Sequence, residues 1–320
     1  MPKPELKFID LFSGIGGFHL GIIQAAKKLG VKAICDIAVD IDEKARETYG
    51  RYFPDVRLGK DVRDPAVQKS ICKNAGIICA GFPCQPFSQA GRMKGFEDAR
   101  GTLFFEIDSI LEVKKPRAVF LENVRNLVSH DEGYTLGRIL QQLEKRGYDI
   151  LVPKEAELLG LSDRDRVKKY VQVNEGKRWS ILKASNYLSP THRPRVYIVA
   201  FNRNKVSVAA RKQFQFPIPT GKKTLEDVLG KPWPNIVGKT LRVGGRSSPH
   251  GNRHNWDSYN GTDKSIKIIG PAEGLKIMGF PQDYFPEKLS TTQRMKQLGN
   301  SVAIPVIQAV ASEIIKVLRL

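Results

Sequence analysis

The chain has 320 residues, 41% of them hydrophobic and 27% charged, so it is long enough to bury a core and too apolar to be a disordered chain. No stretch reaches the ~20 consecutive apolar residues of a membrane span, and we expect no secretory signal, because Met1-Pro2-Lys3-Pro4-Glu5 leads directly into a strand-like segment. Lys and Arg number 52 against 33 Asp and Glu, and the net charge of +19 favours a polyanion such as nucleic acid as partner; a basic surface kept for solubility is the alternative.

In the first two thirds of the chain, segments with the apolar pattern of buried strands alternate with segments of helical period. Strands are expected at 7–12, 31–39, 76–80, 117–121 and 196–201. Helices are expected at 18–29, 42–49, 102–114 and 135–146. This alternation predicts an α/β fold with a doubly wound, mostly parallel sheet and helices on both faces. A charged stretch at 162–170, inside a long connection, is interpreted as a solvated surface helix.

The pattern changes after about residue 202, where Gly, Pro, Asn, His and basic residues become frequent. We expect a second, smaller domain of short strands and loops at 202–264, with one helical segment at 224–229. A connecting segment at 265–298 contains a predicted helix at 272–278, and an amphipathic helix at 302–320 ends the chain. The four cysteines form no CxxC pair, which favours a reducing, cytosolic compartment over a disulfide framework.

A glycine-rich turn, residues 13–17, follows the first strand and leads into the first helix. Such a turn lets a ligand approach the backbone, and the helix N-terminus favours an anionic group. The turn does not match GxGxxG and has no Walker lysine, which argues against a dinucleotide or a triphosphate. Asp40, at the end of the second strand, suits two ribose hydroxyls, and Asp61 suits an adenine amino group. This set fits S-adenosylmethionine; glycines needed only for a tight turn are the alternative.

Two reactive side chains follow neighbouring predicted strands. Cys84 lies between Pro83 and Pro86 after the third strand, and Glu122 ends the next one. A thiolate nucleophile beside a carboxyl group that can hold a proton would form a catalytic pair at one edge of the sheet. Taken singly, a buried structural cysteine and a helix-capping glutamate are the alternatives.

Several motifs together are similar to those of the C5-cytosine DNA methyltransferases. Phe12-Ser-Gly-Ile-Gly-Gly17, Gly81-Phe-Pro-Cys-Gln85 and Glu122-Asn-Val124 resemble three of the family's motifs in their family order. Residues 94–105 resemble its loop that closes over DNA, and Arg193-Pro-Arg195 resembles its Gln-x-Arg-x-Arg motif. Met278-Gly-Phe-Pro281 and Gln297-Leu-Gly-Asn-Ser-Val302 resemble its last two motifs. The similarity extends from Phe8 to the C-terminus.

The resemblance implies methyl transfer from S-adenosylmethionine to C5 of a cytosine flipped out of a specific double-stranded DNA sequence. By the family's mechanism, Cys84 adds to ring C6 while Glu122 holds and protonates N3. Arg193 and Arg195 match the family's paired arginines, and Arg195 would contact the cytosine carbonyl and brace Glu122. Loss of the C5 proton and elimination of the cysteine would release the product.

The resemblance also implies binding residues and a domain division, with no metal. The cofactor would contact Phe12, Gly14, Ile15, Gly17, Asp40, Ile41, Asp61, Val62, Pro83, Leu103, Asn300 and Val302. DNA would contact Gln85, Ser88, Arg92, Lys94, Thr240, Arg242, Gly244, Gly245 and Arg246. Because Asn300 lies far along the chain, residues 299–320 would return to 1–201 to complete a Rossmann-like catalytic domain, and 202–264 would recognise the target.

Thr191 replaces the glutamine of the family's Gln-x-Arg-x-Arg, Leu188 a usual glycine, and the connection 151–183 is longer than in the shortest members. Three alternatives remain: a tRNA cytosine methyltransferase, a catalytically inactive DNA-binding regulator, and a dinucleotide oxidoreductase. The expected setting is the cytoplasm of a prokaryote, or a phage, near the nucleoid, with the chain acting as a monomer and a separate restriction endonuclease as a possible partner.

Overall fold

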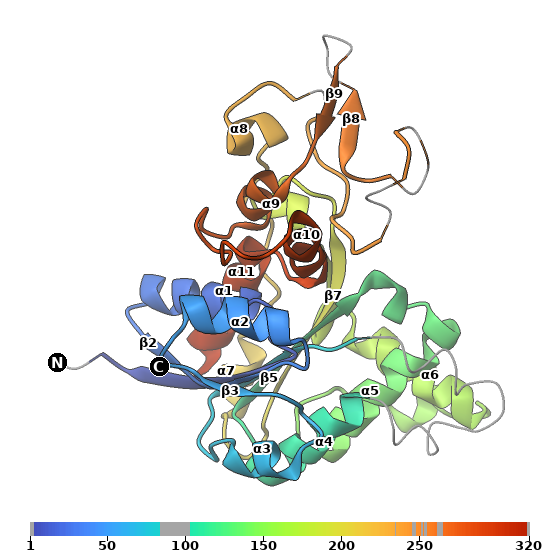
Figure 1. The fold of residues 1–320 in the computed structure, drawn as a ribbon. Helices are drawn as coiled ribbons and strands as arrows, with labels where there is room; N and C mark the ends of the chain where they lie inside the picture. Colours follow the sequence, from blue (N-terminus) through green and yellow to red (C-terminus); the bar gives the residue numbers. More distant parts are fainter. Residues whose placement is uncertain are drawn as a thin grey trace.

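A seven-stranded sheet organises the larger part of the molecule (Figure 1). The structure is a computed structural model that describes residues 3–83, 103–233, 235–244, 248–250, 252, 255–260 and 265–318. The strand order is β3-β2-β1-β4-β5-β7-β6. The strands are β1 (Glu5–Leu11), β2 (Lys32–Val39), β3 (Arg57–Gly59), β4 (Ile77–Gly81), β5 (Ala118–Val124), β6 (Trp179–Lys183) and β7 (Pro194–Phe201). Strands β3, β2, β1, β4 and β5 run parallel, and β7 pairs antiparallel with both β5 and β6. The predicted mostly parallel α/β sheet is therefore confirmed.

Side chains alternate between two apolar clusters, one on each face of the sheet. On β5, for example, Phe120 belongs to one cluster and Leu121 to the other. Helices α1 (Gly17–Lys28) and α11 (Ile304–Leu318) cover the first face, and α4 (Leu103–Lys114) and α5 (Tyr134–Lys145) cover the second. The remaining helices are α2 (Glu43–Tyr52), α3 (Pro65–Ser70), α6 (Asp163–Asn174), α7 (Val208–Lys212), α8 (Leu225–Leu229), α9 (Pro271–Met278) and α10 (Thr291–Asn300).

The last helix packs directly on the first, although they lie at opposite ends of the sequence (Figure 1). A Cβ on Gly21 would lie 2.5 Å from Cγ2 of Ile307, so glycine is needed for this close helix approach. The stretch Thr291–Leu318 has a mean hydropathy of 1.7 in its most apolar window, which is enough by composition for a membrane span. It is divided into α10 and α11, however, and most of α11 is buried against the sheet and α1, as in a core helix.

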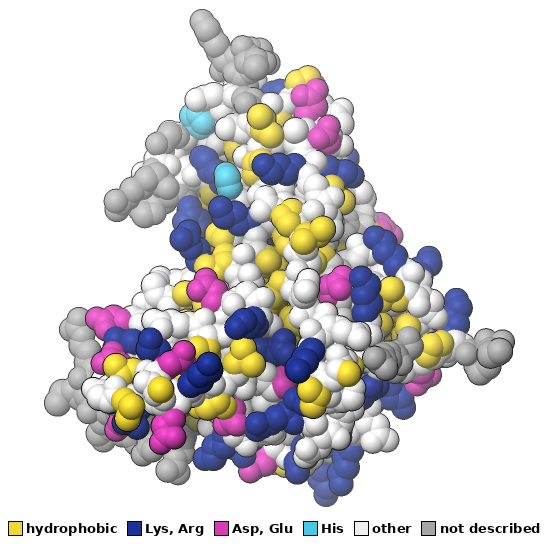
Figure 2. All heavy atoms as spheres, turned by 180° about the vertical axis from the view of Figure 1, so that it is seen from behind, with side chains coloured by type: hydrophobic (Ala, Val, Ile, Leu, Met, Phe, Trp, Pro, Cys, Tyr) yellow, Lys and Arg dark blue, Asp and Glu magenta, His cyan; other side chains and the backbone are white. Residues whose placement is uncertain are grey.

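The smaller part of the molecule lies above the sheet in Figure 1 and contains α8, α9, α10 and a short hairpin of β8 (Ser258–Asn260) and β9 (Ile266–Ile268). Its buried Trp256, Leu241 and Leu298 belong to the same apolar cluster as α1 and α11. Figure 2 shows Lys and Arg side chains gathered where this part narrows toward the sheet. Phe214, by contrast, packs on Phe201 of β7, so the chain just after residue 202 still packs with the sheet.

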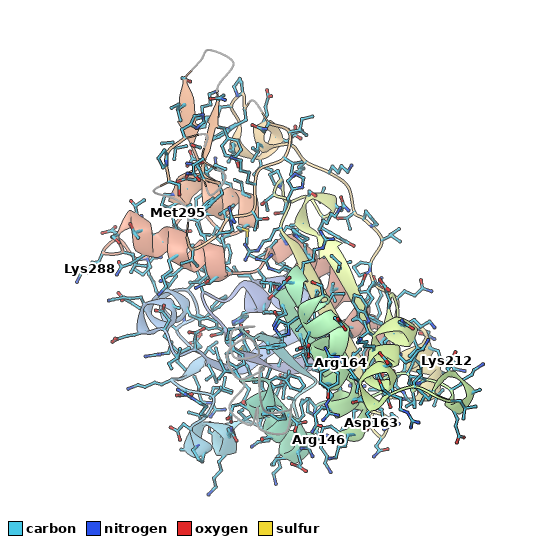
Figure 3. The ribbon with its side chains drawn as sticks, turned by 90° about the vertical axis from the view of Figure 1, so that its right-hand side faces the viewer. Arg146, Asp163, Arg164, Lys212, Lys288 and Met295 are labelled. Carbon is cyan, nitrogen blue, oxygen red and sulfur yellow. The ribbon has the colours of Figure 1, made fainter. Side chains whose placement is uncertain are left out.

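The long connection 151–183 contains more structure than the sequence suggested. Its charged segment forms α6, as predicted, but α6 packs closely on α5, where a Cβ on Gly137 would lie 2.4 Å from the Val167 carbonyl oxygen. Arg164, labelled in Figure 3, donates to Asp131 in the turn just before α5. Strand β6 and helix α10 were not predicted, because both are short segments whose burial depends on partners elsewhere in the chain.

Candidate active site

The glycine turn and Asp40 form one rigid unit at the ends of β1 and β2. Gly14 and Gly16 have φ of 52° and 84°, the left-handed region that favours glycine. Asp40 accepts hydrogen bonds from the backbone N–H of Gly14 at 2.7 Å and of Asp42 at 2.8 Å. Burial raises the pKa of the Asp40 carboxyl, and these two backbone donors oppose the shift. Asp42 caps α2 by accepting from the N–H groups of Lys44 and Ala45.

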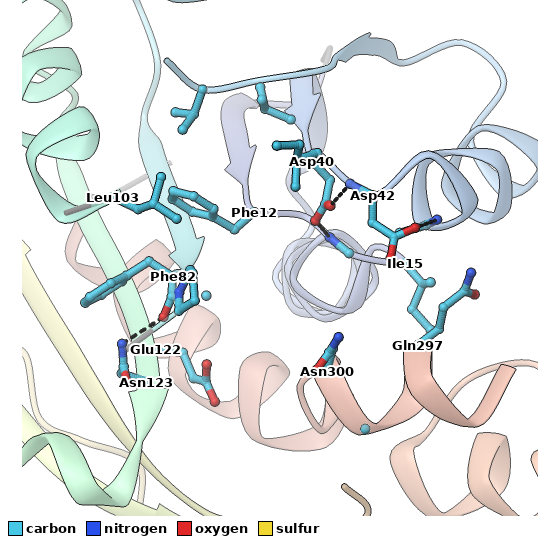
Figure 4. Close-up of a pocket in the computed structure, with 18 of the residues that line it drawn as sticks. Phe12, Ile15, Asp40, Asp42, Phe82, Leu103, Glu122, Asn123, Gln297 and Asn300 are labelled. Carbon is cyan, nitrogen blue, oxygen red and sulfur yellow. Dashed lines mark hydrogen bonds between the residues drawn. The ribbon is translucent and has the colours of Figure 1, made fainter. Parts of the chain in front are cut away.

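A pocket of about 830 Å³ opens above this turn at the carboxyl ends of the parallel strands (Figure 4). This is where open α/β sheets bind their ligands, at the point where the strand order reverses. Most of the predicted cofactor residues line the pocket: Phe12, Gly14, Ile15, Asp40, Ile41, Asp61, Val62, Pro83, Leu103 and Asn300. In Figure 4, Asp40 and Glu122 are well separated in the pocket, and Asn300 projects into it from the helix below.

Glu122 and Arg195 form a buried ion pair at the second end of the pocket. Arg195 Nε lies 3.0 Å from Glu122 Oε1, and both side chains are largely buried. The antiparallel register of β5 and β7 places Tyr197 opposite Glu122, so Arg195 is its diagonal neighbour on the same face of the sheet. Burial raises the pKa of Glu122, while the charges of Arg195 and Arg193 lower it. The structure therefore brings together the carboxyl and guanidinium groups that the sequence predicted as a pair.

Arg193 has partners that differ from those expected of a catalytic group. It is 3% exposed, and its guanidinium donates to the carbonyl oxygens of Leu241, Gly299 and Ser301. Arginine suits this arrangement because one planar group presents several donors in a fixed geometry. The arginine thus connects the chain just before β7 to two distant segments. It also lines the pocket with Glu122, and its predicted catalytic role stays a prediction.

Two predicted cofactor contacts lie behind the pocket instead of on its lining. A Cβ on Gly17 would lie 2.7 Å from Cγ2 of Val302 and 2.9 Å from Oγ of Ser301. Gly17 and Val302 therefore pack against each other where α1 meets the start of α11, and the need for glycine here is steric. Their contacts with the cofactor stay predictions, since the resemblance gave motif membership but not the direction in which each residue faces.

The predicted adenine acceptor, Asp61, has a partner of its own. Arg63 Nη2 lies 2.7 Å from Asp61 Oδ2, and this hydrogen-bonded partner lowers the pKa of the carboxyl. Asp61 still lines the pocket, but a contact with adenine stays a prediction. Cys84, Gln85, Ser88, Arg92, Lys94, Gly245 and Arg246 lie outside the described residues, so their predicted roles also stay predictions.

The sequence analysis missed several lining residues, chiefly Phe82, Lys296 and Gln297. Gln297 fixes α10 to α2, since its amide donates to the Lys44 carbonyl and accepts from Thr48 Oγ1. Lys296 forms an ion pair with Asp42 at 3.0 Å. Lys296 and Gln297 could have been found from their position one turn before Asn300, but they lie on α10, a helix that was not predicted.

A second, more open cleft of about 640 Å³ adjoins the Arg195 side of the site. It is lined by Arg125, His192, Pro194, Arg195, Lys239, Thr240, Arg242, Asn252 and Asn255. Thr240 and Arg242 were predicted to contact DNA, whereas Arg125, His192 and Lys239 were missed although they neighbour predicted residues. Gly244, also predicted, accepts a hydrogen bond from Trp256 Nε1 and does not line the cleft. Cationic and amide side chains around an open cleft are the groups that contact phosphates and base edges.

Comparisons with known proteins agree with this geometry. The sequence matches the family model described as C-5 cytosine-specific DNA methylase over residues 6–242 and 234–316. Type II methyltransferase M.NlaX of Neisseria lactamica is 34% identical over 338 residues, covering 96% of this chain and 95% of that protein. Type II methyltransferase M1.ScrFI of Lactococcus lactis subsp. cremoris is 32% identical over 348 residues, covering 98% of this chain and 79% of that protein.

Among solved structures, the methyltransferase EhMeth of Entamoeba histolytica has the same fold, with a TM-score of 0.67, 16% identity and 98% coverage of both chains. One family model thus matches residues 6–316 of this chain. The same chain has this strand order, the glycine turn with Asp40, and the Glu122–Arg195 pair at the edge of the sheet. The chain belongs to the C-5 cytosine-specific DNA methylases, enzymes that methylate C5 of cytosine in DNA and for which S-adenosylmethionine is the implied methyl donor.

Proposed function

We propose that the pocket holds S-adenosylmethionine at its Asp40 end and a flipped cytosine at its Glu122 end, with Cys84 as the nucleophile. The observation that carries this proposal is the continuity of one pocket from the glycine turn to the Glu122–Arg195 pair. A methyl donor and its acceptor must meet within a few ångströms, and a shared cavity allows this. Pro83 lines the pocket and immediately precedes Cys84 in the sequence, which supports the assignment of the nucleophile.

The residues at the first end fit S-adenosylmethionine. The buried Asp40 carboxylate suits the two ribose hydroxyls, and the volume lies within the range of small-molecule sites. Ile41 is 69% exposed although it is apolar, and with Val62 and Leu103 it offers an apolar lining for an adenine ring. Asn300 would hold the amino-acid part of the donor. When bound, S-adenosylmethionine supplies an electrophilic methyl group.

At the second end, the chain's own groups account for the activation of the ring. The Cys84 thiolate would form a bond to C6, and the electron pair displaced from the ring would be balanced by a proton that Glu122 holds at N3. The raised pKa of Glu122 suits a carboxyl that must keep a proton near neutral pH. Arg195 would brace this carboxyl and contact the base carbonyl. After methylation, loss of the C5 proton and of the cysteine would restore the aromatic ring.

The open cleft would receive the DNA backbone beside the flipped base. Arg125, His192 and Lys239 line it next to Arg195, and the net charge of +19 supports a polyanionic partner. We place the chain in a prokaryotic cytoplasm or a phage, associated with the nucleoid, as a monomeric modification enzyme that acts separately from a restriction endonuclease. We keep 202–264 as the target recognition domain and 265–298 as the connecting segment; the packing of Phe214 on Phe201 favours a start after about residue 216.

A trapping experiment tests the proposal. A duplex library containing 5-fluorocytosine is incubated with the protein and tritiated S-adenosylmethionine, with fluorinated tRNA and duplex lacking fluorine as parallel substrates. Because fluorine at C5 cannot leave as a cation, the Cys84–C6 bond should persist and carry label onto the protein in the duplex arm alone. Label trapped by tRNA but not by duplex would contradict the DNA assignment, and methylation without any trapped complex would contradict the covalent route.

A further inference from the structure

The segment 238–241 is fastened to the chain just before β7 by a regular set of hydrogen bonds. Gly238 N–H donates to the Pro190 carbonyl at 2.8 Å, and His192 N–H donates to the Gly238 carbonyl at 3.0 Å. Side chains continue the pattern, since Thr191 Oγ1 donates to the Lys239 carbonyl at 2.9 Å and Arg193 Nη1 to the Leu241 carbonyl at 2.9 Å. Because Thr191 and Arg193 are alternate residues that hold alternate carbonyls, they fix the register of this segment.

The segment held in this way provides one wall of the open cleft. Lys239, Thr240 and Arg242 line the cleft together with Arg125 and Arg195. Lys239 is itself fixed, since its ammonium group donates to the Asn255 carbonyl at 3.2 Å and lies 5.4 Å from the centre of the Tyr259 ring. The position of 238–242 therefore decides where these side chains meet DNA.

Arg193 also holds the segment that lines the cofactor pocket. Its Nη2 donates to the Gly299 carbonyl at 3.0 Å and to the Ser301 carbonyl, on either side of Asn300. The two segments touch each other as well, because a Cβ on Gly299 would lie 2.7 Å from the Arg242 carbonyl carbon and 2.8 Å from the Val243 nitrogen. A shift of residues 299–301 therefore cannot occur without a shift of 241–243 or of the guanidinium between them.

We propose that Arg193 is a positioning residue that couples binding of the methyl donor in the pocket to binding of DNA in the cleft. The inference rests on the proposed function, which gives the two cavities their ligands. A donor molecule that orders Asn300 also fixes the carbonyls of 299 and 301, and through the buried guanidinium it fixes the carbonyl of Leu241 and hence the cleft wall. Leaving three buried carbonyls without this donor removes the constraint on both segments.

The test is a binding cycle in which turnover cannot occur. The dissociation constant for duplex DNA is measured with and without S-adenosylhomocysteine, the demethylated form of the donor, for each variant. In the unaltered protein, S-adenosylhomocysteine should lower the dissociation constant for DNA by about tenfold, which is within the usual range of coupling between sites. In Arg193→Met the coupling factor should fall below about twofold, and in Arg193→Lys, which keeps the charge but not the planar fork, it should be intermediate.

A second buried arginine provides the matched control. Arg178 is 8% exposed and, like Arg193, donates to main-chain carbonyls, in this case those of Asp149, Lys177 and Arg211, none of which lines either cavity. It also forms a buried ion pair with the Asp149 carboxylate at 2.6 Å. Arg178→Met should therefore lower the melting temperature at least as much as Arg193→Met while the coupling factor stays unchanged. Thr191→Val, which releases only the Lys239 carbonyl, should weaken DNA binding about threefold and leave nucleoside affinity unchanged.

The outcomes separate this inference from the function on which it rests. A folded Arg193→Met that keeps the tenfold coupling would overturn the inference. A folded Arg193→Met that loses kcat while both dissociation constants and their coupling stay unchanged would also overturn it, because this would indicate direct catalysis. An unaltered protein that binds both ligands without coupling would also overturn it. If Arg193→Met does not fold, Arg193→Lys and Thr191→Val carry the test. Failure of the unaltered protein to bind either ligand would instead contradict the proposed function.

Discussion

The two cavities are built by different means. Around the pocket, functional side chains are placed by the hydrogen-bonded register of neighbouring strands, as for Glu122 on β5 and Arg195 on β7. Around the cleft, the described residues have little regular structure, and side chains such as Thr191 and Arg193 hold the main chain of 238–241 instead. The difference suggests that the chemistry is fixed by the sheet, while the recognition surface can change its sequence provided that a few carbonyl contacts remain.

The largest expected effect comes from removing the proposed nucleophile. Cys84→Ser should lower methyl transfer by about 10⁴-fold or more, because a serine hydroxyl is a far weaker nucleophile than a thiolate and no other group replaces it. If chemistry and recognition are separable, the affinity for duplex DNA should stay within about twofold of the unaltered protein. Transfer of tritiated methyl groups and a DNA-binding assay on the same preparation check this. Residual turnover above a hundredth of the original rate would refute the nucleophile assignment.

Glu122→Gln should have the next largest effect. It should lower the turnover number by about 10²- to 10⁴-fold because the carboxyl proton is lost from the site. Burial raises the pKa of Glu122, so activity should decline as the pH rises through that raised value and the carboxyl loses its proton. The glutamine variant should lack this decline. Glu144→Gln, which alters a surface ion pair with Arg203, is the control that should leave the pH profile unchanged.

Asp40→Asn should act on donor binding alone. A carboxylate that holds Gly14 N–H and meets two hydroxyls contributes charge-assisted hydrogen bonds, so the dissociation constant for S-adenosylhomocysteine should rise about 10- to 100-fold. DNA affinity measured without the nucleoside should not change. The control is Asp36→Asn, on the strand that precedes Asp40; it pairs with Arg57, does not line the pocket and should leave both constants unaltered. A loss of DNA affinity in Asp40→Asn would break the separation between the two cavities.

Arg125→Gln should have a smaller effect, confined to the cleft. Arg125 is exposed and lines the cleft, so its loss should weaken DNA binding a few-fold and reduce the slope of log affinity against log salt by about one. The turnover number at saturating DNA should stay the same. The control is Lys212→Gln, which removes one positive charge from an exposed residue of α7 that does not line the cleft and is labelled in Figure 3. An equal salt slope in the two variants would show that total charge, not the cleft, governs binding.

Asp10→Asn should change stability and little else. Asp10 is fully buried on β1, where Cys79 Sγ donates to its Oδ1, and burial raises the pKa of the carboxyl well above its ordinary value. The stability that comes from this raised pKa is present in acid and is lost as the pH rises through it. The asparagine variant cannot ionise, so its melting temperature should gain roughly 2 °C or more on the unaltered protein as the pH becomes alkaline. A difference in melting temperature between the two proteins that stays constant across the pH range would contradict this.

Much of the site could be predicted from the sequence because its residues are adjacent to elements with strong local patterns. The glycine turn, Asp40 and Glu122 each follow a buried strand, and parallel strands bring their carboxyl ends to one edge. Arg193 and Val302 show what this reasoning leaves undecided. Membership of a motif says which residues are near a site, but the direction of each side chain depends on what packs against it, here the 299–301 segment and Gly17.

By itself, the sequence determined the alternation of strands and helices, the turn that needs glycine and the family to which the chain belongs. These depend on local periodicity, on backbone sterics and on side chains close together in the chain. Only the tertiary structure decided that Arg193 bonds the carbonyls of two distant segments, that α10 forms at all, and that residues 239, 240 and 242 line the cleft. Those features rest on contacts between segments far apart in the sequence, which form only when the whole chain is folded.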